Sequence, residues 1–507
     1  MSIANLGMLL AIGIYLFAMI MIGVRFSRKN ADTDDFFIGG RRLGPFVTAM
    51  SAEASDMSSW LLMGLPGVAY LSGTADVAWT AIGLAVGTWF NWLLVAKKLR
   101  RYTEKTQSIT VPAFFSNRYH DDRRILQLVA AVWIVVFFVP YTASGFAACG
   151  KLFSALFGLD YHFAMIVSAA VIILYTALGG FLAASTTDLI QSIVMSIALV
   201  VILVFGAATA GGFAAVMANA QSLPGYLGLN TMFDVASGSS VNYSFLTICS
   251  TLAWGLGYFG MPHILLRFMA IKDDEKLPLS RRIGTIWVVI SMFVSIVIGV
   301  VGLAITNGGT IEFLEGSASE TIIVKIAQLL ANKGFLAALL AGVVIGGILA
   351  STMSTSDSQL LAASSSVSRD IMVDVLKMKI DKSKQLLISR ITLLVIAVIG
   401  IFLAWNSDSN VFRIVSFAWA GFGASFGPAV LLALFWKRSN KNGALAGMVT
   451  GGVMIFVWKF LVRPLGGILN IYELLPAFLI AMAVNVAVSL LTAAPDKSIT
   501  DEFDSIQ

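Results

Sequence analysis

Long apolar segments recur from one end of the chain to the other, separated by shorter polar stretches. A run of about 20 apolar residues is long enough to cross the hydrocarbon core of a bilayer as a helix. The pattern predicts about thirteen such spans, at residues 6–24, 46–71, 77–96, 126–153, 163–178, 190–210, 243–266, 284–306, 336–367, 390–405, 412–436, 443–462 and 473–492. An all-α polytopic membrane protein is therefore predicted.

Composition supports this class, because 58% of the 507 residues are hydrophobic and only 12% are charged, against about 25% charged in soluble domains. The net charge of +6 does not require a nucleic-acid partner, because the positively charged residues of a membrane protein gather in its cytoplasmic loops. Cys149 and Cys249 both fall in predicted spans, so no disulfide framework or transition-metal site is expected. No nucleotide-binding loop or catalytic triad is present. We therefore expect no enzymatic activity, no cofactor and no obligate protein partner. Any transport of a solute against its concentration gradient would be driven by an ion gradient.

Basic residues fall mainly on one side of the predicted spans. The loops around 25–42, 97–124, 267–282, 369–390 and 437–441, together with Lys497, hold 28 of the 34 Lys and Arg residues. Because Lys and Arg concentrate in cytoplasmic loops, an odd number of spans places the N-terminus outside and the C-terminus in the cytoplasm. The two long loops on the other side, about 211–242 and 307–335, are candidates for external lids.

The second predicted span is unusually polar. The stretch 51–67, SAEASDMSSWLLMGLPG, carries Glu53 and Asp56 within an apolar surrounding. A carboxylate at membrane depth costs roughly 2.5–3.5 kcal/mol on insertion scales, so it usually faces a cavity, an ion or a partner. Pro66 and Gly67 follow it, and both weaken a helix. The sequence predicts an interrupted helix with a carboxylate at mid-depth, as cation-coupled transporters use.

The seventh predicted span has a similar weakness. Gly255, Gly257, Gly260 and Pro262 cluster in TLAWGLGYFGMPHILLRF, where they would free backbone carbonyls for an ion or a substrate. The alternative is that these glycines only permit close helix packing. Two interrupted spans, five apart, suggest two inverted five-helix units. The predicted division is a first span and loop (1–45), two repeats (46–210 and 243–436) around an outer loop (211–242), two C-terminal spans (437–492) and a tail (493–507).

The ninth predicted span carries hydroxyl groups on one helix face. Residues three and four apart share a face, which aligns Ser351, Ser354, Thr355 and Ser358, with Asp357 beside them. Sodium is a hard cation that prefers oxygen ligands, so this stripe together with carbonyls freed on another helix would suit it. The alternative is that the hydroxyls bond to carbonyls of their own helix.

Two further groups of residues have open interpretations. Asp188 is either an acid at a helix N-terminus, favoured by the helix dipole, or a partner for a second cation or an inner gate. The aromatic residues near the two interruptions are either pocket residues for a compact amphipathic substrate or interfacial and core residues; they are Trp60, Tyr141, Trp254 and Tyr258.

Five strings carry a resemblance to a known family across nearly the whole chain: GGRRLGPFVTAMSAEASDMSSWLLMGLPG (39–67), ALGGFLAASTTDLIQS (177–192), WGLGYFGMPHILLRFMA (254–270), MSTSDSQLL (353–361) and SFAWAGFGASFGPAVLLALFWKRSNKNGALAGM (416–448). The chain resembles the sodium/solute symporter family, and within it the bacterial members that carry proline. The resemblance implies a leucine-transporter-type fold with ten core helices in two inverted repeats, the first and sixth of them broken, and three additional spans.

The resemblance also implies a function. A secondary active transporter in the bacterial cytoplasmic membrane is expected, importing L-proline with sodium by alternating access. Another small amino or carboxylic acid, with sodium or protons, remains an alternative, as does a transporter-like sensor.

Roles for individual residues come from the same resemblance. It implies sodium ligands at the carbonyls of Ala54, Met57 and Ser351 and at the side chains of Ser354 and Thr355. Asp56 matches an essential carboxylate, Ser58 a hydroxyl that affects ion and substrate, and Arg41 a functionally sensitive arginine, here predicted as a gate residue. The implied substrate contacts are Trp60, Tyr141, Trp254, Tyr258 and Pro262.

Glu53 and Asp357 depart from the family pattern. Proline-carrying members often have a small residue where this chain has Glu53, and Asp357 adds a carboxylate beside the hydroxyl stripe. Glu53 and Asp56 are three residues apart, so they share a face if the helix is intact there. Repulsion between two such charges leads to the hypothesis that Glu53 takes a proton in part of the cycle or holds a second cation. Both departures, with Asp188, are expected to affect ion coupling.

Overall fold

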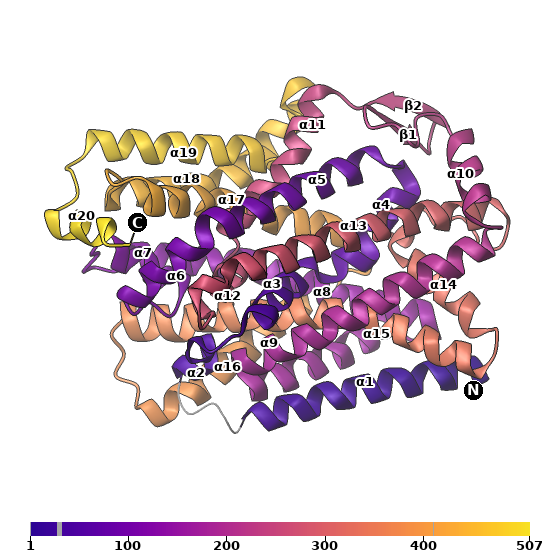
Figure 1. Ribbon diagram of the computed structural model, residues 1–507, viewed down its shortest axis with the longest axis horizontal. Coiled ribbons are helices and arrows are strands. Elements are labelled where there is room, and N and C mark those ends of the chain that lie inside the picture. Colours follow the sequence, from indigo (N-terminus) through magenta and orange to yellow (C-terminus); the bar gives the residue numbers. More distant parts are fainter. Residues whose placement is uncertain (1, 28–32, 409, 507) are drawn as a thin grey trace.

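The computed structural model describes residues 2–27, 33–408 and 410–506. Most helices run along the long axis of the molecule (Figure 1). One end holds the N-terminus and a small β-hairpin, and we call it the N-terminal end. The other holds the C-terminus, and we call it the C-terminal end. Residues 28–32, part of the first predicted cytoplasmic loop, lie outside the described residues.

The elements follow one another as helices with a single hairpin of two strands among the described residues. In chain order they are α1 (Ile3–Ser27), α2 (Thr33–Ile38), η1 (Gly39–Arg41), α3 (Pro45–Ser59), η2 (Trp60–Gly64), α4 (Leu65–Ser72), α5 (Ala75–Phe90), η3 (Asn91–Val95), α6 (Ala96–Lys105), α7 (Val111–Arg118), α8 (Ile125–Phe157), α9 (Tyr161–Thr209), α10 (Phe213–Ser222), β1 (Thr231–Asp234), β2 (Ser239–Asn242), α11 (Phe245–Leu252), η4 (Ala253–Gly260), α12 (Pro262–Ala270), η5 (Asp274–Lys276), α13 (Leu277–Asn307), η6 (Gly316–Thr321), α14 (Ile322–Ala331), α15 (Phe335–Ser365), η7 (Ser366–Val375), α16 (Lys382–Leu403), α17 (Val411–Phe435), α18 (Lys441–Val457), η8 (Trp458–Val462), η9 (Arg463–Leu465), η10 (Gly467–Leu469), α19 (Leu474–Leu491) and α20 (Lys497–Asp504).

Ten helices of the described residues are long and apolar enough to cross a membrane. The predicted spans 46–71 and 243–266 are not among these ten. The helix from Phe245 to Gly260 is too short, and α3, η2 and α4, although contiguous, carry Glu53, Asp56 and several serines, which lower the hydropathy of that segment. The predicted spans 163–178 and 190–210 form one 49-residue element, α9. The predicted membrane class is therefore confirmed, while these boundaries differ from the prediction.

Gly180 divides α9. Its backbone angles, φ 64° and ψ −168°, are not helical. The two ends of α9 lie near α14: the carbonyl of Leu156, in the last turn of α8 and five residues before α9 begins, accepts a hydrogen bond from Gln328, and a Cβ placed on Gly206 would lie 3.7 Å from Ile326. The chain therefore doubles back at Gly180, and the two halves of α9 correspond to the two predicted spans.

The central helices are buried by their neighbours, while peripheral helices expose apolar side chains. On α1, Leu10 is 48% exposed and Phe17 is 66% exposed, and on α16 Phe402 is 69% exposed. In a bilayer, such faces contact lipid tails and need no further protein cover. The segments predicted as outer lids contain α10, the β1–β2 hairpin, η6 and α14, which gather at the N-terminal end (Figure 1).

The reversal at Gly180 gives a stability prediction. Its φ and ψ fall in a region that only glycine adopts without strain, so Gly180→Ala should destabilise the fold by about 1–3 kcal/mol. The measurement is the melting temperature of the purified protein in detergent. Gly346→Ala is the matched control, because Gly346 lies within α15 and an added Cβ would have its nearest neighbour at 3.9 Å. Equal melting temperatures for the two variants would contradict the argument.

Candidate functional site

The first predicted interruption lies at Ser58, near the end of α3. Ser58 has φ 47° and ψ −171°, and the chain continues through the π-helical turn η2 into α4. A non-glycine residue in this region is strained. The Ser58 hydroxyl compensates in part by accepting a hydrogen bond from the Trp60 amide at 3.1 Å. The predicted interruption is confirmed: it lies at Ser58, while Pro66 occupies the first turn of α4.

The second predicted interruption is the 3₁₀ segment η4 between α11 and α12. Met261 leaves the helical path with φ −75° and ψ 108°, and Pro262 opens α12. The glycines of this segment also permit close packing. A Cβ on Gly257 would meet the Trp419 Nε1 at 2.0 Å, and a Cβ on Gly260 would meet the Phe422 carbonyl oxygen at 2.2 Å. Both interpretations of these glycines, break and close packing, therefore apply.

Asp56 joins the two interrupted helices. The Tyr258 hydroxyl on η4 donates to the Asp56 carboxylate at 2.6 Å, and the Tyr141 hydroxyl on α8 donates to the Asp56 backbone oxygen at 3.4 Å. The other carboxylate oxygen of Asp56 is buried and has no hydrogen-bond partner among the described residues. A buried, unpaired carboxylate oxygen is costly unless a cation or a donor meets it.

Aromatic side chains surround this carboxylate. The cavity beside Asp56 leaves only about 10 Å³ of free space, about enough for one water molecule. Trp60 and Trp254 stack with ring centroids 5.9 Å apart, and Tyr472 stacks on Trp254 at 5.2 Å. The cavity is lined by Asp56, Met57, Trp60, Leu84, Tyr141, Trp254, Val415 and Trp419. The structure therefore brings the predicted aromatic residues together around Asp56.

The predicted sodium ligands lie where α3 meets α15. The Ser354 hydroxyl donates to the Ala54 carbonyl at 2.8 Å across this contact. The Thr355 hydroxyl donates to the Ser351 carbonyl of its own helix at 3.2 Å, and the Met57 carbonyl accepts from the Trp60 amide. These buried oxygens are the type of donor that a hard cation such as sodium requires. Their chemistry fits the ion.

Glu53 lies on the other side of α3, against α5 and η3. Its carboxylate accepts a hydrogen bond from the Trp92 indole at 2.8 Å and from the Thr88 hydroxyl at 3.1 Å. Gly284 of α13 packs so closely that an added Cβ would lie 2.8 Å from the carboxylate. The proton or second cation expected at Glu53 stays a prediction.

Asp188 is buried within α9, eight positions beyond Gly180, so its predicted place at a helix N-terminus is wrong. Its carboxylate pairs with Arg267 of α12 at 3.2 Å and accepts from the Ser51 hydroxyl at 2.6 Å. Arg267 also donates to the Ser358 hydroxyl of α15 at 2.5 Å. This cluster connects four helices between the Asp56 cavity and the C-terminal end.

Asp357 extends the cluster of Asp188 and Arg267. Its carboxylate accepts from the Tyr175 hydroxyl of α9 at 2.5 Å and from the Ser358 hydroxyl at 3.0 Å. The cluster thus holds two carboxylates and one guanidinium, all buried. Its residues join the hydroxyl stripe of α15 to α9 and α12.

Arg41 and Pro262 lie apart from the Asp56 cavity. Arg41 donates to the backbone oxygens of Met269, Thr103 and Ser108 at 2.6, 2.9 and 2.8 Å, which ties η1 to the ends of α12 and α6. Pro262 begins α12 and lies outside the cavity lining. A gate role for Arg41 and a substrate contact for Pro262 stay predictions.

Several residues of this region were missed by the sequence analysis. Trp419 donates from its indole to the Trp254 carbonyl at 2.7 Å, Arg267 pairs with Asp188, and Phe412 packs against Trp254 with ring centroids 5.6 Å apart. Arg267 carried a signal, because an arginine in the apolar string HILLRFMA is as costly as a buried carboxylate. The aromatic residues carried none, since they occur throughout membrane helices.

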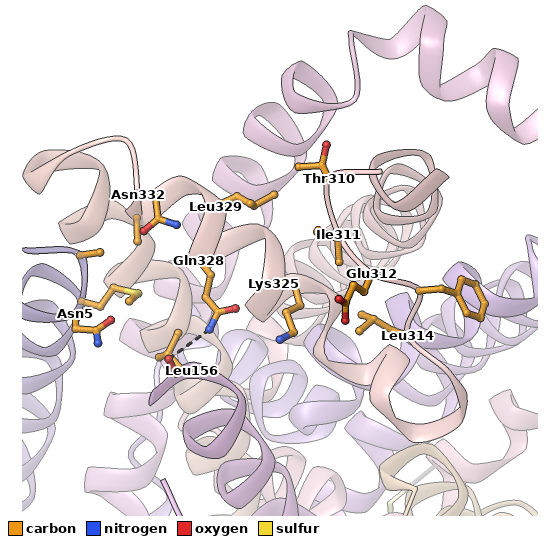
Figure 2. Close-up of a pocket in the computed structure, with 14 residues that line it drawn as sticks. Asn5, Leu156, Thr310, Ile311, Glu312, Leu314, Lys325, Gln328, Leu329 and Asn332 are labelled. Atoms are coloured by element: carbon orange, nitrogen blue, oxygen red, sulfur yellow. Dashed lines mark hydrogen bonds between the residues drawn. The ribbon is translucent and has the colours of Figure 1, made fainter. Parts of the chain in front are cut away.

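A second hollow has a volume of about 440 Å³ and lies at the N-terminal end, beside the start of α1. Figure 2 shows the residues that line it. Lys325 and Gln328 of α14 line it, together with the segment from Thr310 to Leu314 and the start of α1. It shares no lining residue with the Asp56 cavity. The hollow therefore lies between α14, the start of α1 and the segment that leads into η6, and it is separate from the predicted transport site.

Comparison with known proteins places this arrangement in a family. Residues 36–451 match the model of the sodium:solute symporter family. The sodium/proline symporter of Salmonella typhimurium is 41% identical over 498 residues, covering 98% of this chain and 95% of that protein. The osmoregulated proline transporter OpuE of Bacillus subtilis is 39% identical over 495 residues, covering 97% of this chain and 96% of that protein.

Solved structures share the fold at lower sequence identity. A sodium-coupled sialic acid symporter in a substrate-bound, outward-open state has a TM-score of 0.79 at 17% identity, covering 98% of this chain and 99% of that one. The nucleobase-cation-symport-1 family transporter Mhp1 has a TM-score of 0.53 at 14% identity, covering 92% of this chain and 98% of that one. With the family model matching most of its length, this chain belongs to the sodium:solute symporter family.

Proposed function

We propose that this protein is a secondary active transporter that imports L-proline together with sodium by alternating access. The observation that carries the proposal is the Asp56 carboxylate, which lies at one helix break, is held by Tyr258 from the other break, and is ringed by aromatic side chains. Relatives at 39% and 41% identity, aligned over nearly the whole chain, are named as proline transporters.

Sodium binds between α3 and α15 in this proposal. Its ligands are the carbonyls of Ala54, Met57 and Ser351 and the hydroxyls of Ser354 and Thr355. The hydrogen bond from Ser354 to the Ala54 carbonyl brings two of these oxygens within 2.8 Å. Sodium replaces that hydrogen bond, and the negative charge of Asp56, two residues from Ala54, favours the cation.

Proline binds beside Asp56. Amide groups freed at the half-helix ends suit its carboxylate, and the rings of Trp60, Trp254 and Tyr141 suit its pyrrolidine ring. Because the present cavity leaves only about 10 Å³, the surrounding helices must separate to admit proline. Sodium that stabilises the broken segment of α3 raises the affinity for proline, and linkage makes the effect reciprocal.

Alternating access requires closure on each side in turn. The Arg267–Asp188 cluster closes the C-terminal side of the cavity, and the aromatic stack of Trp254, Phe412 and Tyr472 closes the N-terminal side. With both closures in place, the structure supports an occluded form. In the proposed cycle the closures open one at a time, so that sodium and proline pass without a continuous pore.

The repeat architecture and orientation are part of the proposal. The proposal has thirteen crossings; the ten candidate spans, the division of α9 at Gly180 and the two interrupted segments support this count. Ten of them form the inverted repeats 46–210 and 243–436, with broken first and sixth core helices. The N-terminal end faces outward across the bacterial cytoplasmic membrane, since the basic loops lie at the other end.

Proline uptake tests the function directly. Proteoliposomes with an inward sodium gradient should accumulate radiolabelled proline, and Asp56→Ala should lower the initial rate at least about tenfold, since about 1.4 kcal/mol of lost binding already suffices. Asp370→Asn is the matched control, because Asp370 is also buried but bonds to Thr110 and Gln127, away from the cavity. Failure to accumulate proline under any ion gradient would refute the proposed substrate.

The sodium site gives a separate prediction. Ser354→Ala removes one proposed ligand, so the half-saturating sodium concentration of uptake should rise about tenfold. Ser356→Ala is the control, since its hydroxyl faces Gly145 of α8. Sodium titration of uptake at saturating proline is the measurement. An unchanged sodium dependence in Ser354→Ala would move the ion site elsewhere.

A further inference from the structure

The second interrupted helix contains an unusually long 3₁₀ segment. The segment η4 extends over eight residues, from Ala253 to Gly260. Such runs rarely exceed three or four residues, because the hydrogen-bond geometry of a 3₁₀-helix is poorer than that of an α-helix. A segment of this length therefore needs support from its neighbours, and α5 packs along its side.

Two glycines of α5 bring its backbone against the second interrupted helix. A Cβ on Gly83 would lie 2.5 Å from the carbonyl oxygen of Leu252, the last residue of α11. A Cβ on Gly87 would lie 2.3 Å from the carbonyl oxygen of Gly255 in η4. Because no side chain fits at either position, the two backbones lie in direct contact.

Asn91 makes the next contact along the same face of α5, four residues beyond Gly87. Its side-chain amide nitrogen donates to the Tyr258 carbonyl of η4 at 3.0 Å. The side chain is fully buried, and its Oδ1 has no hydrogen-bond partner among the described residues. A buried amide with one unpaired group costs free energy relative to an apolar side chain. The described hydrogen bond of this side chain is therefore made with η4, at the residue that holds Asp56.

The spacing of these three contacts matches the geometry of the two helices. Four residues of an α-helix rise about 6 Å, and three residues of a 3₁₀-helix also rise about 6 Å. Positions 83, 87 and 91 of α5 therefore stay level with positions 252, 255 and 258 while η4 is a 3₁₀-helix. In an α-helical segment three residues would rise only about 4.5 Å, and the contacts would lose their register. The face of α5 thus fits the 3₁₀ form.

The form of η4 decides where the Tyr258 hydroxyl lies. Each residue turns about 120° in a 3₁₀-helix and about 100° in an α-helix. Between Leu252 and Tyr258 this difference amounts to about 120° in total. The Tyr258 hydroxyl, which donates to the Asp56 carboxylate at 2.6 Å, would then point away from it. The contact between the two interrupted helices therefore depends on the 3₁₀ form.

We infer that Asn91 is a positioning residue: by donating to the Tyr258 carbonyl, it holds η4 in its 3₁₀ form and keeps the Tyr258 hydroxyl on Asp56. The inference rests on the proposed transport function for its purpose but not for its geometry. Loss of the amide leaves the Tyr258 carbonyl without this donor at a depth where lipid supplies none. The segment η4 then opens more often, and Asp56 loses its partner each time.

Hydrogen–deuterium exchange tests this geometry without a substrate. The full chain is placed in lipid nanodiscs with sodium, and mass spectrometry follows peptides that cover η4 and, for comparison, α8. Asn91→Ala should raise the exchange rate of the η4 amides about tenfold, which corresponds to about 1.4 kcal/mol for the lost hydrogen bond and the carbonyl left unpaired. The α8 peptides should exchange at the rate of the unmodified protein.

Asn485→Ala is the matched control. Asn485 is also a fully buried asparagine with one unpaired polar atom, but it lies in α19 against Gly443 and Gly447 of α18. Its substitution should leave η4 exchange unchanged. If Asn91→Ala does not fold, Asn91→Ser replaces it and should raise η4 exchange similarly, because a serine hydroxyl can bond to a carbonyl of its own helix but is too short to replace the amide.

A double-mutant cycle tests whether Asn91 acts through Tyr258. Tyr258→Phe removes the hydroxyl that reaches Asp56 and keeps the ring. Proline uptake into proteoliposomes is measured for both single variants and the double variant, as the maximal rate divided by the half-saturating proline concentration. Asn91→Ala should lower this ratio at least about fivefold in the unmodified protein and less than about twofold in Tyr258→Phe, because coupled residues are not additive. Additive losses would overturn the inference.

An η4 exchange rate within about twofold of the unmodified protein, in Asn91→Ala or in its serine replacement, would also overturn the inference. An equal rise in the α8 peptides would do the same, since it would report general destabilisation, as would an equal rise in η4 for Asn485→Ala. If exchange behaves as expected but the unmodified protein accumulates no proline, the proposed substrate is refuted and the role of Asn91 stands.

Discussion

The departure of the backbone from helical geometry at Ser58 is the constraint around which this structure is organised. A break in the middle of a membrane helix leaves amide and carbonyl groups without helical partners, and lipid supplies none. The surrounding protein must therefore supply them. The Ser58 hydroxyl accepts the Trp60 amide, Ser354 donates to the Ala54 carbonyl, and Tyr141 donates to the Asp56 carbonyl. The groups that satisfy the break are also those proposed to bind the ion and substrate.

Buried charge is distributed on both sides of this break. Asp56 is held by a neutral hydroxyl from Tyr258, so its charge remains available to a cation. Asp188, by contrast, is paired with Arg267. Nearer the N-terminal end, Glu320 is paired with Lys151. Two carboxylates of this region are thus held in ion pairs, and Asp56, one of whose carboxylate oxygens has no hydrogen-bond partner among the described residues, lies between them.

The aromatic cavity connects these closures to the chemistry of the substrate. Trp254 contacts rings from several helices and its carbonyl accepts the Trp419 indole, so its position depends on α17 as well as η4. A cavity with about 10 Å³ of free space cannot hold proline until one of these contacts is released. A substrate as large as proline can therefore enter only if the helices move, whichever side chains recognise it.

The sequence alone determined the membrane class, the two interrupted segments and the carboxylate at the first of them, because apolar length and a charge at membrane depth are local properties of the chain. It also indicated the hydroxyl stripe of α15, since helical spacing places Ser351, Ser354 and Ser358 on one face. The residue at which the helix breaks, Ser58, was decided by the structure, while Pro66 is tolerated in the first turn of α4.

Only the tertiary structure decided which distant groups meet. The sequence left two interpretations of Asp188 open, and the structure places it inside α9, away from a helix N-terminus, where it pairs with Arg267, 79 positions away in the chain. Phe412 and Trp419 gave no signal in the sequence, because aromatic residues are common in membrane helices. Their role depends on where α17 crosses the two broken helices. Such pairings arise from packing between elements that are far apart in the chain, which local spacing does not specify.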